Sequence, residues 1–171
     1  TGQQHGVVLA DRDLSPLTPF INWRDRRAEE LDPRTDTTYL HQARALLGED
    51  ARQRTGCTLA PGFMGATLHW MRSTGVMPSD ATACFIMDFV GATLTGTQAV
   101  TDATCAGSSG LLDVPTRQWD HGLIDALGLS EVRSPELREA GQPLGRITAQ
   151  AAEVTGLPAG LPVCVPAGDN Q

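Results

Sequence analysis

Hydrophobic and polar positions along the chain follow the two periods expected of a mixed α/β protein. Short apolar runs at 6–11 and 19–23 predict two β-strands, with the turn sequence DRDLSP between them. A buried run at 83–87 leads into a helix at 88–94, and the charged segment 24–31 can open another. Apolar residues recurring every three or four positions predict four more helices: 39–47, 62–73, 119–128 and 146–156. Because strands and helices alternate, the predicted fold class is α/β.

Three of these helices carry apolar stripes that should face a core: Phe63, Ala66, Thr67 and Trp70; Trp119, Leu123, Ile124 and Leu127; and Ile147, Ala151 and Val154. The two tryptophans, Trp70 and Trp119, are therefore assigned to the core. Asp88 opens its helix and is expected to be the N-cap residue. Three histidines on or beside helices are expected at the surface or in hydrogen bonds, and not as ligands: His41, His69 and His121.

Composition narrows the class of protein. The chain has 171 residues, of which 40% are hydrophobic and 19% charged, which is enough to bury the core of one domain. Its net charge of -7 argues against a general binder of nucleic-acid phosphates. All 13 basic residues are arginine, and they are scattered along the chain. Apolar runs stay well below the roughly 20 residues of a membrane span, so neither a nucleic acid nor a membrane is an expected partner.

The four cysteines are far apart in the sequence and show no spacing that suits zinc. Most have apolar or small neighbours, among which cysteine behaves as a small hydrophobic residue. A reducing cytoplasm is the expected location, and no metal ligand is assigned. The cysteines are Cys57, Cys84, Cys105 and Cys164.

Familiar catalytic motifs do not occur in the chain. It contains no P-loop, no dinucleotide-binding G-x-G-x-x-G, no G-x-S-x-G and no H-E-x-x-H. What remains are three polar clusters at predicted strand ends: Gln3, Gln4 and His5; Trp23, Asp25 and Arg27; and Asp169, Asn170 and Gln171. Amides and histidine both donate and accept hydrogen bonds, and an indole can cover the apolar face of a sugar. A carboxylate near a sugar hydroxyl can accept its proton.

Six segments occur in an order that resembles the FGGY family of carbohydrate kinases, and within it xylulokinases and related ketose kinases. These segments are TGQQHG, WRDRR, TGCTLAPGFMGATLHW, DFVGATLTG, TDATCAGSSGLLDV and TGLPAGLPVCVPAGDNQ. The resemblance implies an actin-like (ribonuclease H-like) ATPase fold with sugar bound between two domains. It also implies that residues 1–171 are the later part of the N-terminal, sugar-binding domain. The first strands and the C-terminal domain, which binds most of ATP and Mg²⁺, would lie outside this chain.

The resemblance assigns roles to individual residues. Asp169 matches the general base of the family, Asn170 would bond substrate hydroxyls, and His5 matches a substrate-binding histidine. Gln4 stands where xylulokinases usually carry methionine, so it leaves the identity of the sugar open. Asp169 as a turn cap, and His5 as a hydrogen-bonded residue at a strand edge, are the structural alternatives.

The WRDRR segment matches a family motif in which Trp23 walls the sugar and Asp25 bonds hydroxyls or orients Arg27. The alternative is that Asp25 and Arg27 form only a structural clamp. Arg26 gives the segment some likeness to glycerol kinases, whereas GFMGATLHW resembles sedoheptulose kinases. For TDATCAGSSG, a turn of small residues beside the cleft is preferred over a phosphate-binding nest.

The predicted activity is ATP-dependent phosphorylation of a sugar hydroxyl, with D-xylulose as the first candidate. Sedoheptulose and glycerol or another polyol are alternatives within the same family. Two other classes stay open: an actin-fold module that binds sugar without phosphorylating it, and an interaction fragment without enzymatic activity. The expected partner is a small sugar, and the assignment is compatible with a homodimer.

Overall fold

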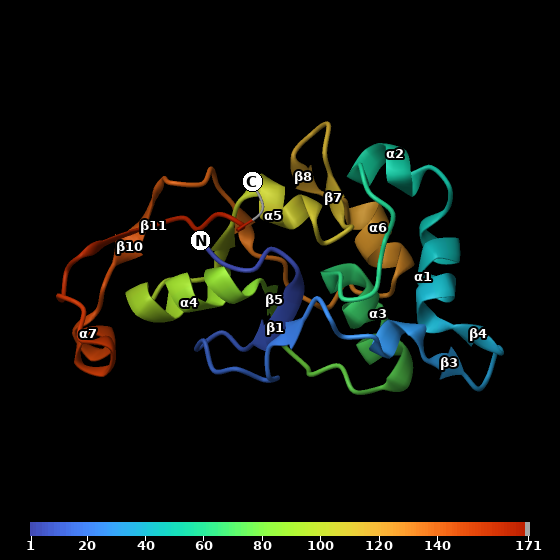
Figure 1. The fold of residues 1–171 in the computed structure, drawn as a ribbon, viewed down its shortest axis with the longest axis horizontal. Helices are drawn as coiled ribbons and strands as arrows, with labels where there is room; N and C mark the ends of the chain where they lie inside the picture. The colour runs from blue at the N-terminus through green and yellow to red at the C-terminus, as the bar shows by residue number, and fades with distance from the viewer. Residues whose placement is uncertain (170–171) are drawn as a thin grey trace.

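The computed structural model describes residues 1–169 of the 171. Figure 1 shows a central group of short strands, with helices to either side and a hairpin at one end. The helical segments are η1 (Arg27–Glu29, a 3-10 turn), α1 (Tyr39–Leu47), α2 (Ala51–Thr55), α3 (Met64–Thr74), α4 (Ile86–Thr95), α5 (Ala103–Gly107), α6 (His121–Ala126) and α7 (Ala149–Thr155). The strands are β1 (Gly6–Ala10), β2 (Ile21–Asn22), β3 (Leu31–Asp32), β4 (Thr37–Thr38), β5 (Thr82–Cys84), β6 (Val100–Thr101), β7 (Leu112–Asp113), β8 (Gln118–Trp119), β9 (Glu136–Leu137), β10 (Pro143–Arg146) and β11 (Pro162–Cys164).

Strand β1 is the centre of the molecule. It pairs antiparallel with β2 on one side and with β5 on the other, which gives the sheet order β2-β1-β5. Val7 and Leu9 belong to the large core cluster that includes Met64 of α3, whereas Val8 packs with Ala92 of α4. Helices therefore cover both faces of β1, which explains why its sequence is apolar without alternation. The predicted α/β class is confirmed.

Helix α4 begins earlier than expected, and Asp88 is not its N-cap. Phe85 holds the N-cap position in an extended conformation, and the helix starts at Ile86. Asp88 lies three residues into the motif, where its Oδ2 accepts the Phe85 N–H at 3.2 Å, which is half of a capping box. Because its carboxyl is completely buried, the pKa of Asp88 is raised well above its usual range.

The charged segment 24–31 forms a single 3-10 turn and not a helix. The Asp25 carboxylate accepts the Arg27 backbone N–H at 3.0 Å, and such a local bond competes with helix formation.

The hairpin β10–β11 and α7 extend to the end of the molecule opposite α1 (Figure 1). The predicted apolar stripe of this helix is wrong. Ile147 is buried but precedes the first residue of α7, and Val154 is 83% exposed. The predicted end of this helix at residue 156 is confirmed, since Gly156 is its C-cap with a positive φ of 74°.

The two assigned core tryptophans are half-buried and pack against the main core, but Trp119 lies in β8 and not on the helix predicted at 119–128, because α6 begins only at His121. Each indole N–H has a partner: Trp70 donates to Glu30 at 2.9 Å and Trp119 to the Pro135 carbonyl at 2.8 Å. His69 is buried with its Nδ1 3.4 Å from the Leu127 carbonyl, and burial lowers its pKa. His41 and His121 are exposed, so the expected placement of the three histidines, at the surface or in hydrogen bonds, is confirmed.

All four cysteines are free. Within residues 1–169, no group of three or more His, Cys, Asp or Glu side chains could hold a metal ion. None of the helices in that range combines the length and apolar character needed to cross a membrane.

Candidate functional site

The first and last described segments of the chain lie side by side (Figure 1). Gly2 and Gly168 form a parallel bridge, and the Gly2 N–H donates to the Ala167 carbonyl at 3.2 Å. The turn before β1 and the turn after β11 are therefore adjacent. The polar cluster at residues 3–5 and the cluster that contains Asp169 can thus belong to one site. Asn170 lies outside the described residues.

The Asp169 carboxylate is held by the turn before β1. Its Oδ1 accepts the Gln4 backbone N–H at 3.0 Å, and the side chain is exposed. Within residues 1–169, its second oxygen, Oδ2, accepts no hydrogen bond. The carboxylate is thus oriented through one oxygen, and no residue from 1 to 169 bonds the other.

The Gln4 side chain packs against Gly168, in the turn that carries Asp169. Its Nε2 donates to the Thr104 carbonyl at 3.1 Å, and a Cβ added to Gly168 would lie 3.1 Å from three Gln4 side-chain atoms. The Gln4 carbonyl accepts the Ser108 hydroxyl at 2.8 Å. Gln4 is therefore fixed by both its backbone and its amide.

The partner of Gln4 is helix α5, which lies within the TDATCAGSSG segment. This segment is not simply the turn that the sequence predicted: residues 103–107 are helical, and the Asp102 carboxylate caps them by accepting the Cys105 and Thr104 N–H groups. The segment contacts the turn before β1 through Gln4.

His5 stacks on Phe63, with ring centroids 4.6 Å apart and planes 12° apart. Its Nδ1 is buried and has no hydrogen-bond partner among the described residues. The sequence had placed Phe63 on a helical stripe, but it is the N-cap of α3 and packs at the site. Gly62 directly before it was the available signal, because a glycine there indicates a close backbone approach.

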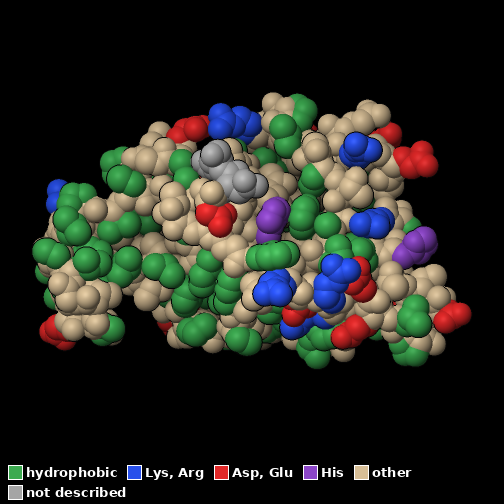
Figure 2. Space-filling model, viewed as in Figure 1, with side chains coloured by type: hydrophobic (Ala, Val, Ile, Leu, Met, Phe, Trp, Pro, Cys, Tyr) green, Lys and Arg blue, Asp and Glu red, His purple; other side chains and the backbone are tan. Residues whose placement is uncertain are grey.

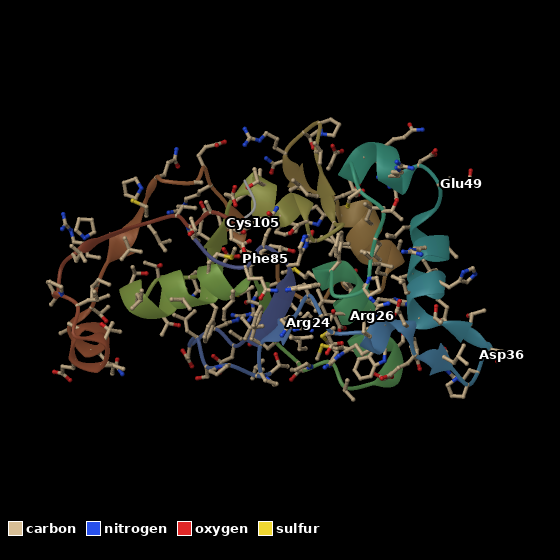
Figure 3. The ribbon with its side chains drawn as sticks, viewed as in Figure 1. Arg24, Arg26, Asp36, Glu49, Phe85 and Cys105 are labelled. Atoms are coloured by element: carbon tan, nitrogen blue, oxygen red, sulfur yellow. The ribbon has the colours of Figure 1, made fainter. Side chains whose placement is uncertain are left out.

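Trp23 and His5 lie at the same end of the sheet. The last pair of β1 with β2 is Gly6↔Asn22, so His5 directly precedes this pair on one strand and Trp23 directly follows it on the other. Gly62 permits this arrangement, since a Cβ there would lie 2.1 Å from the Trp23 carbonyl oxygen. The indole is 56% exposed, and the Arg24 guanidinium lies 5.8 Å from its centroid. Figure 3 labels Arg24 on the segment after β2.

Asp25 is hydrogen-bonded to Arg27. Its two carboxylate oxygens accept Arg27 Nε and an Arg27 terminal nitrogen at 2.8 and 2.9 Å, and the guanidinium lies 4.9 Å from the Trp70 ring centroid. Partial burial opposes ionisation of Asp25, but the Arg27 hydrogen bonds outweigh it and lower its pKa. Both Asp25 oxygens accept hydrogen bonds from Arg27, which fits an orienting role and a structural clamp alike.

Near the middle of one face, an acidic side chain, a histidine and basic side chains lie close together (Figure 2). Such a surface presents hydrogen-bond acceptors, donors and aromatic rings together, which is what recognition of a polyhydroxylated ligand needs.

The model of the N-terminal domain of the FGGY family of carbohydrate kinases matches residues 1–171. The chain belongs to this family. An autoinducer-2 kinase of Escherichia coli (strain K12) is 34% identical over 98% of the chain, and one of Yersinia pestis has the same identity. The chain spans about a third of the length of these relatives.

Solved structures of FGGY kinases have the same fold as the chain. A xylulose kinase from Rhodospirillum rubrum superposes with a TM-score of 0.81 at 28% identity, over 98% of this chain and 33% of that one. A glycerol kinase from Plasmodium falciparum, solved with ADP, gives 0.81 at 22% identity over 99% and 33%, which supports the fold alone. The predicted family and actin-like ATPase fold are confirmed.

Proposed function

We propose that this chain supplies the sugar side of an ATP-dependent carbohydrate kinase, with Asp169 as the general base. The observation that carries the proposal is the Asp169 carboxylate, held at 3.0 Å by the Gln4 N–H with Oδ2 available, next to the His5 turn. Family membership supports the same role, because the family model spans residues 168 and 169 and the Gly-Asp-Asn sequence there resembles the turn that carries the family's general base.

The proposed step transfers one phosphoryl group. A sugar hydroxyl attacks the γ-phosphorus of ATP, its proton passes to Asp169 Oδ2, and the bond between the γ-phosphorus and the bridging oxygen breaks to release ADP. Mg²⁺ neutralises charge on the phosphates in such reactions. The described residues contain no cluster suited to a cation, so we assign no Mg²⁺ ligand here. We propose that most of the nucleotide site is formed by polypeptide outside these 171 residues. The relative from E. coli has room for it, because this chain matches only 31% of its length.

We further propose a ketose as substrate, with D-xylulose first. The R. rubrum xylulose kinase structure supports this choice. A second candidate is autoinducer-2, because the E. coli and Y. pestis relatives at 34% identity carry that name. Asp169, His5 and Trp23 would contact the sugar, and Asp25 would act through Arg27. Asn170 keeps its proposed role in bonding hydroxyls, and the cytoplasm is the proposed location.

The test is sugar-dependent ATP turnover by the complete polypeptide that the gene encodes. Four substrates should be compared by kcat/KM: D-xylulose, sedoheptulose, glycerol and autoinducer-2. We expect D-xylulose to lead by about 100-fold or more over the poorest substrate, because a site that bonds a hydroxyl strongly rejects analogues lacking it. If autoinducer-2 leads, the second candidate is correct. Binding of a sugar without any turnover would instead establish a non-catalytic module.

His5→Ala should weaken sugar binding more than it slows the chemistry. Loss of the imidazole removes one hydrogen-bonding group and the ring stacked on Phe63. A hydrogen bond contributes about 1 kcal/mol, so KM for the sugar should rise on the order of five- to tenfold. His41→Ala is the matched control, because His41 is exposed on α1 and should leave KM unchanged. A fall in kcat with unchanged KM would contradict the binding role.

A further inference from the structure

The turn that carries Asp169 rests on helix α5 through Gln4. The Gln4 N–H donates to Asp169 Oδ1 at 3.0 Å. The side-chain amide and the carbonyl of Gln4 are bound to α5 and to Ser108, the residue that follows α5. On that side, the Thr104 carbonyl accepts the Gln4 amide at 3.1 Å and the Ser108 hydroxyl bonds the Gln4 carbonyl at 2.8 Å. The position of the carboxylate therefore depends on residues that do not touch it.

Gly168, the residue before Asp169, packs directly against Gln4. Gly168 also leaves no space above Gln4, since an added Cβ would lie 3.1 Å from Gln4 Cγ, Cδ and Oε1. A displacement of Gln4 would therefore move residues 168 and 169 with it.

Ser108 is the side chain on which this arrangement depends most. It is 9% exposed, and its hydroxyl lies 2.8 Å from the Gln4 carbonyl and 2.7 Å from the Cys105 carbonyl, which share its single proton. Without the hydroxyl, the Gln4 carbonyl would lose this partner in a half-buried position, and the peptide would shift or rotate to find another. Rotation of that segment changes the direction of the neighbouring Gln4 N–H.

We propose that Ser108 and the Gln4 amide are positioning residues that set the Asp169 carboxylate, and that the Gln4 side chain does not read the sugar. This inference rests on the proposed function, in which Asp169 is the base. It differs from the role that the family resemblance suggests for Gln4, because the amide is bound to Thr104 and its Oε1 is buried against Gly168.

Ser108→Ala in the complete encoded polypeptide should lower kcat for sugar phosphorylation by about ten- to a hundredfold, because small displacements of reacting groups cost rates of that order. KM for the sugar should rise by clearly less than kcat falls, since the variant keeps the His5 and Trp23 side chains although the Gln4–His5 peptide shifts. Ser109→Ala is the matched control. Ser109 is fully buried and bonds the Ala106 carbonyl and the Leu111 N–H, but none of its hydrogen bonds involves Gln4. Equal losses of kcat in the two variants, or a rise in KM matching the fall in kcat, would overturn the inference.

The double variant separates positioning from general damage. If Ser108 acts through the base, Ser108→Ala should lower the residual kcat of Asp169→Asn by less than about twofold. The same ten- to hundredfold loss in both backgrounds would overturn the inference. If Asp169→Asn is defective while Ser108→Ala is fully active, the positioning inference fails and the proposed function stands. A fully active Asp169→Asn defeats the proposed function itself.

Gln4→Met provides an independent variant if Ser108→Ala does not fold. It removes the bond to the Thr104 carbonyl but keeps the length of the side chain. We expect a lower kcat and an unchanged ranking of the four substrates. A changed ranking would show that Gln4 contacts the sugar and would overturn the inference.

Discussion

Gly62→Ala should destabilise the protein by about 3 kcal/mol or more and raise KM for the sugar, because strain and clash add at one position. The added Cβ would lie 2.1, 2.6 and 2.7 Å from the Trp23 carbonyl oxygen, carbonyl carbon and Cα. All three are backbone atoms, so relief requires moving the chain that follows β2. Gly62 also has φ +76°, a left-handed conformation that costs other residues roughly 1–2 kcal/mol. Denaturant unfolding, followed by sugar kinetics on the folded fraction, measures both effects.

Gly75→Ala is the control for Gly62→Ala. Gly75 has the same φ of +76°, but nothing lies within 4 Å of an added Cβ. It should therefore show only the backbone cost, on the order of 1 kcal/mol, and leave the sugar kinetics unchanged. Equal losses in the free energy of unfolding for the two alanine variants would show that the close approach of Gly62 to Trp23 has no energetic consequence. Our account of how Trp23 is positioned beside the sugar would then be wrong.

The sequence predicted elements where apolar periodicity and a terminal signal agreed. β1 follows from an apolar run, and α1 was predicted at 39–47, the residues that form it. Boundaries were lost where a side chain bonded the backbone locally. Asp88, which lies inside α4, accepts the backbone N–H of the N-cap residue Phe85. Asp25, which precedes η1, accepts the N–H of the first residue of that turn. Periodicity does not register such bonds.

The sequence predicted which segments form the candidate site. It did not predict the contacts between them. The polar turns before β1 and after β11 were identified from their residue types, and they are adjacent. The direction of the Gln4 amide depends on a partner 100 residues away in the sequence, which no local pattern contains. Phe63 was hidden because an aromatic residue at a helix start fits an apolar stripe equally well.

Asp169→Asn should lower kcat by about 10²–10⁴-fold while sugar affinity changes little. The amide can keep the hydrogen bond from the Gln4 N–H through its carbonyl oxygen, so the turn should retain its shape. An amide at Oδ2 can still bond the attacking hydroxyl, but it cannot accept the proton. Chemistry is therefore lost without loss of the binding surface formed by His5 and Trp23. Glu139→Gln, at an exposed carboxylate paired with Arg117, controls for the removal of one negative charge.

The most direct test of the base assignment is kcat for sugar-dependent ADP formation by the complete polypeptide and its Asp169→Asn variant, with sugar affinity titrated separately for each. The account predicts a fall in kcat of at least about 100-fold with a dissociation constant for the sugar within about threefold. An Asp169→Asn enzyme that keeps more than about a tenth of the wild-type kcat would contradict it, because Asp169 would then be a turn residue and the base would lie elsewhere.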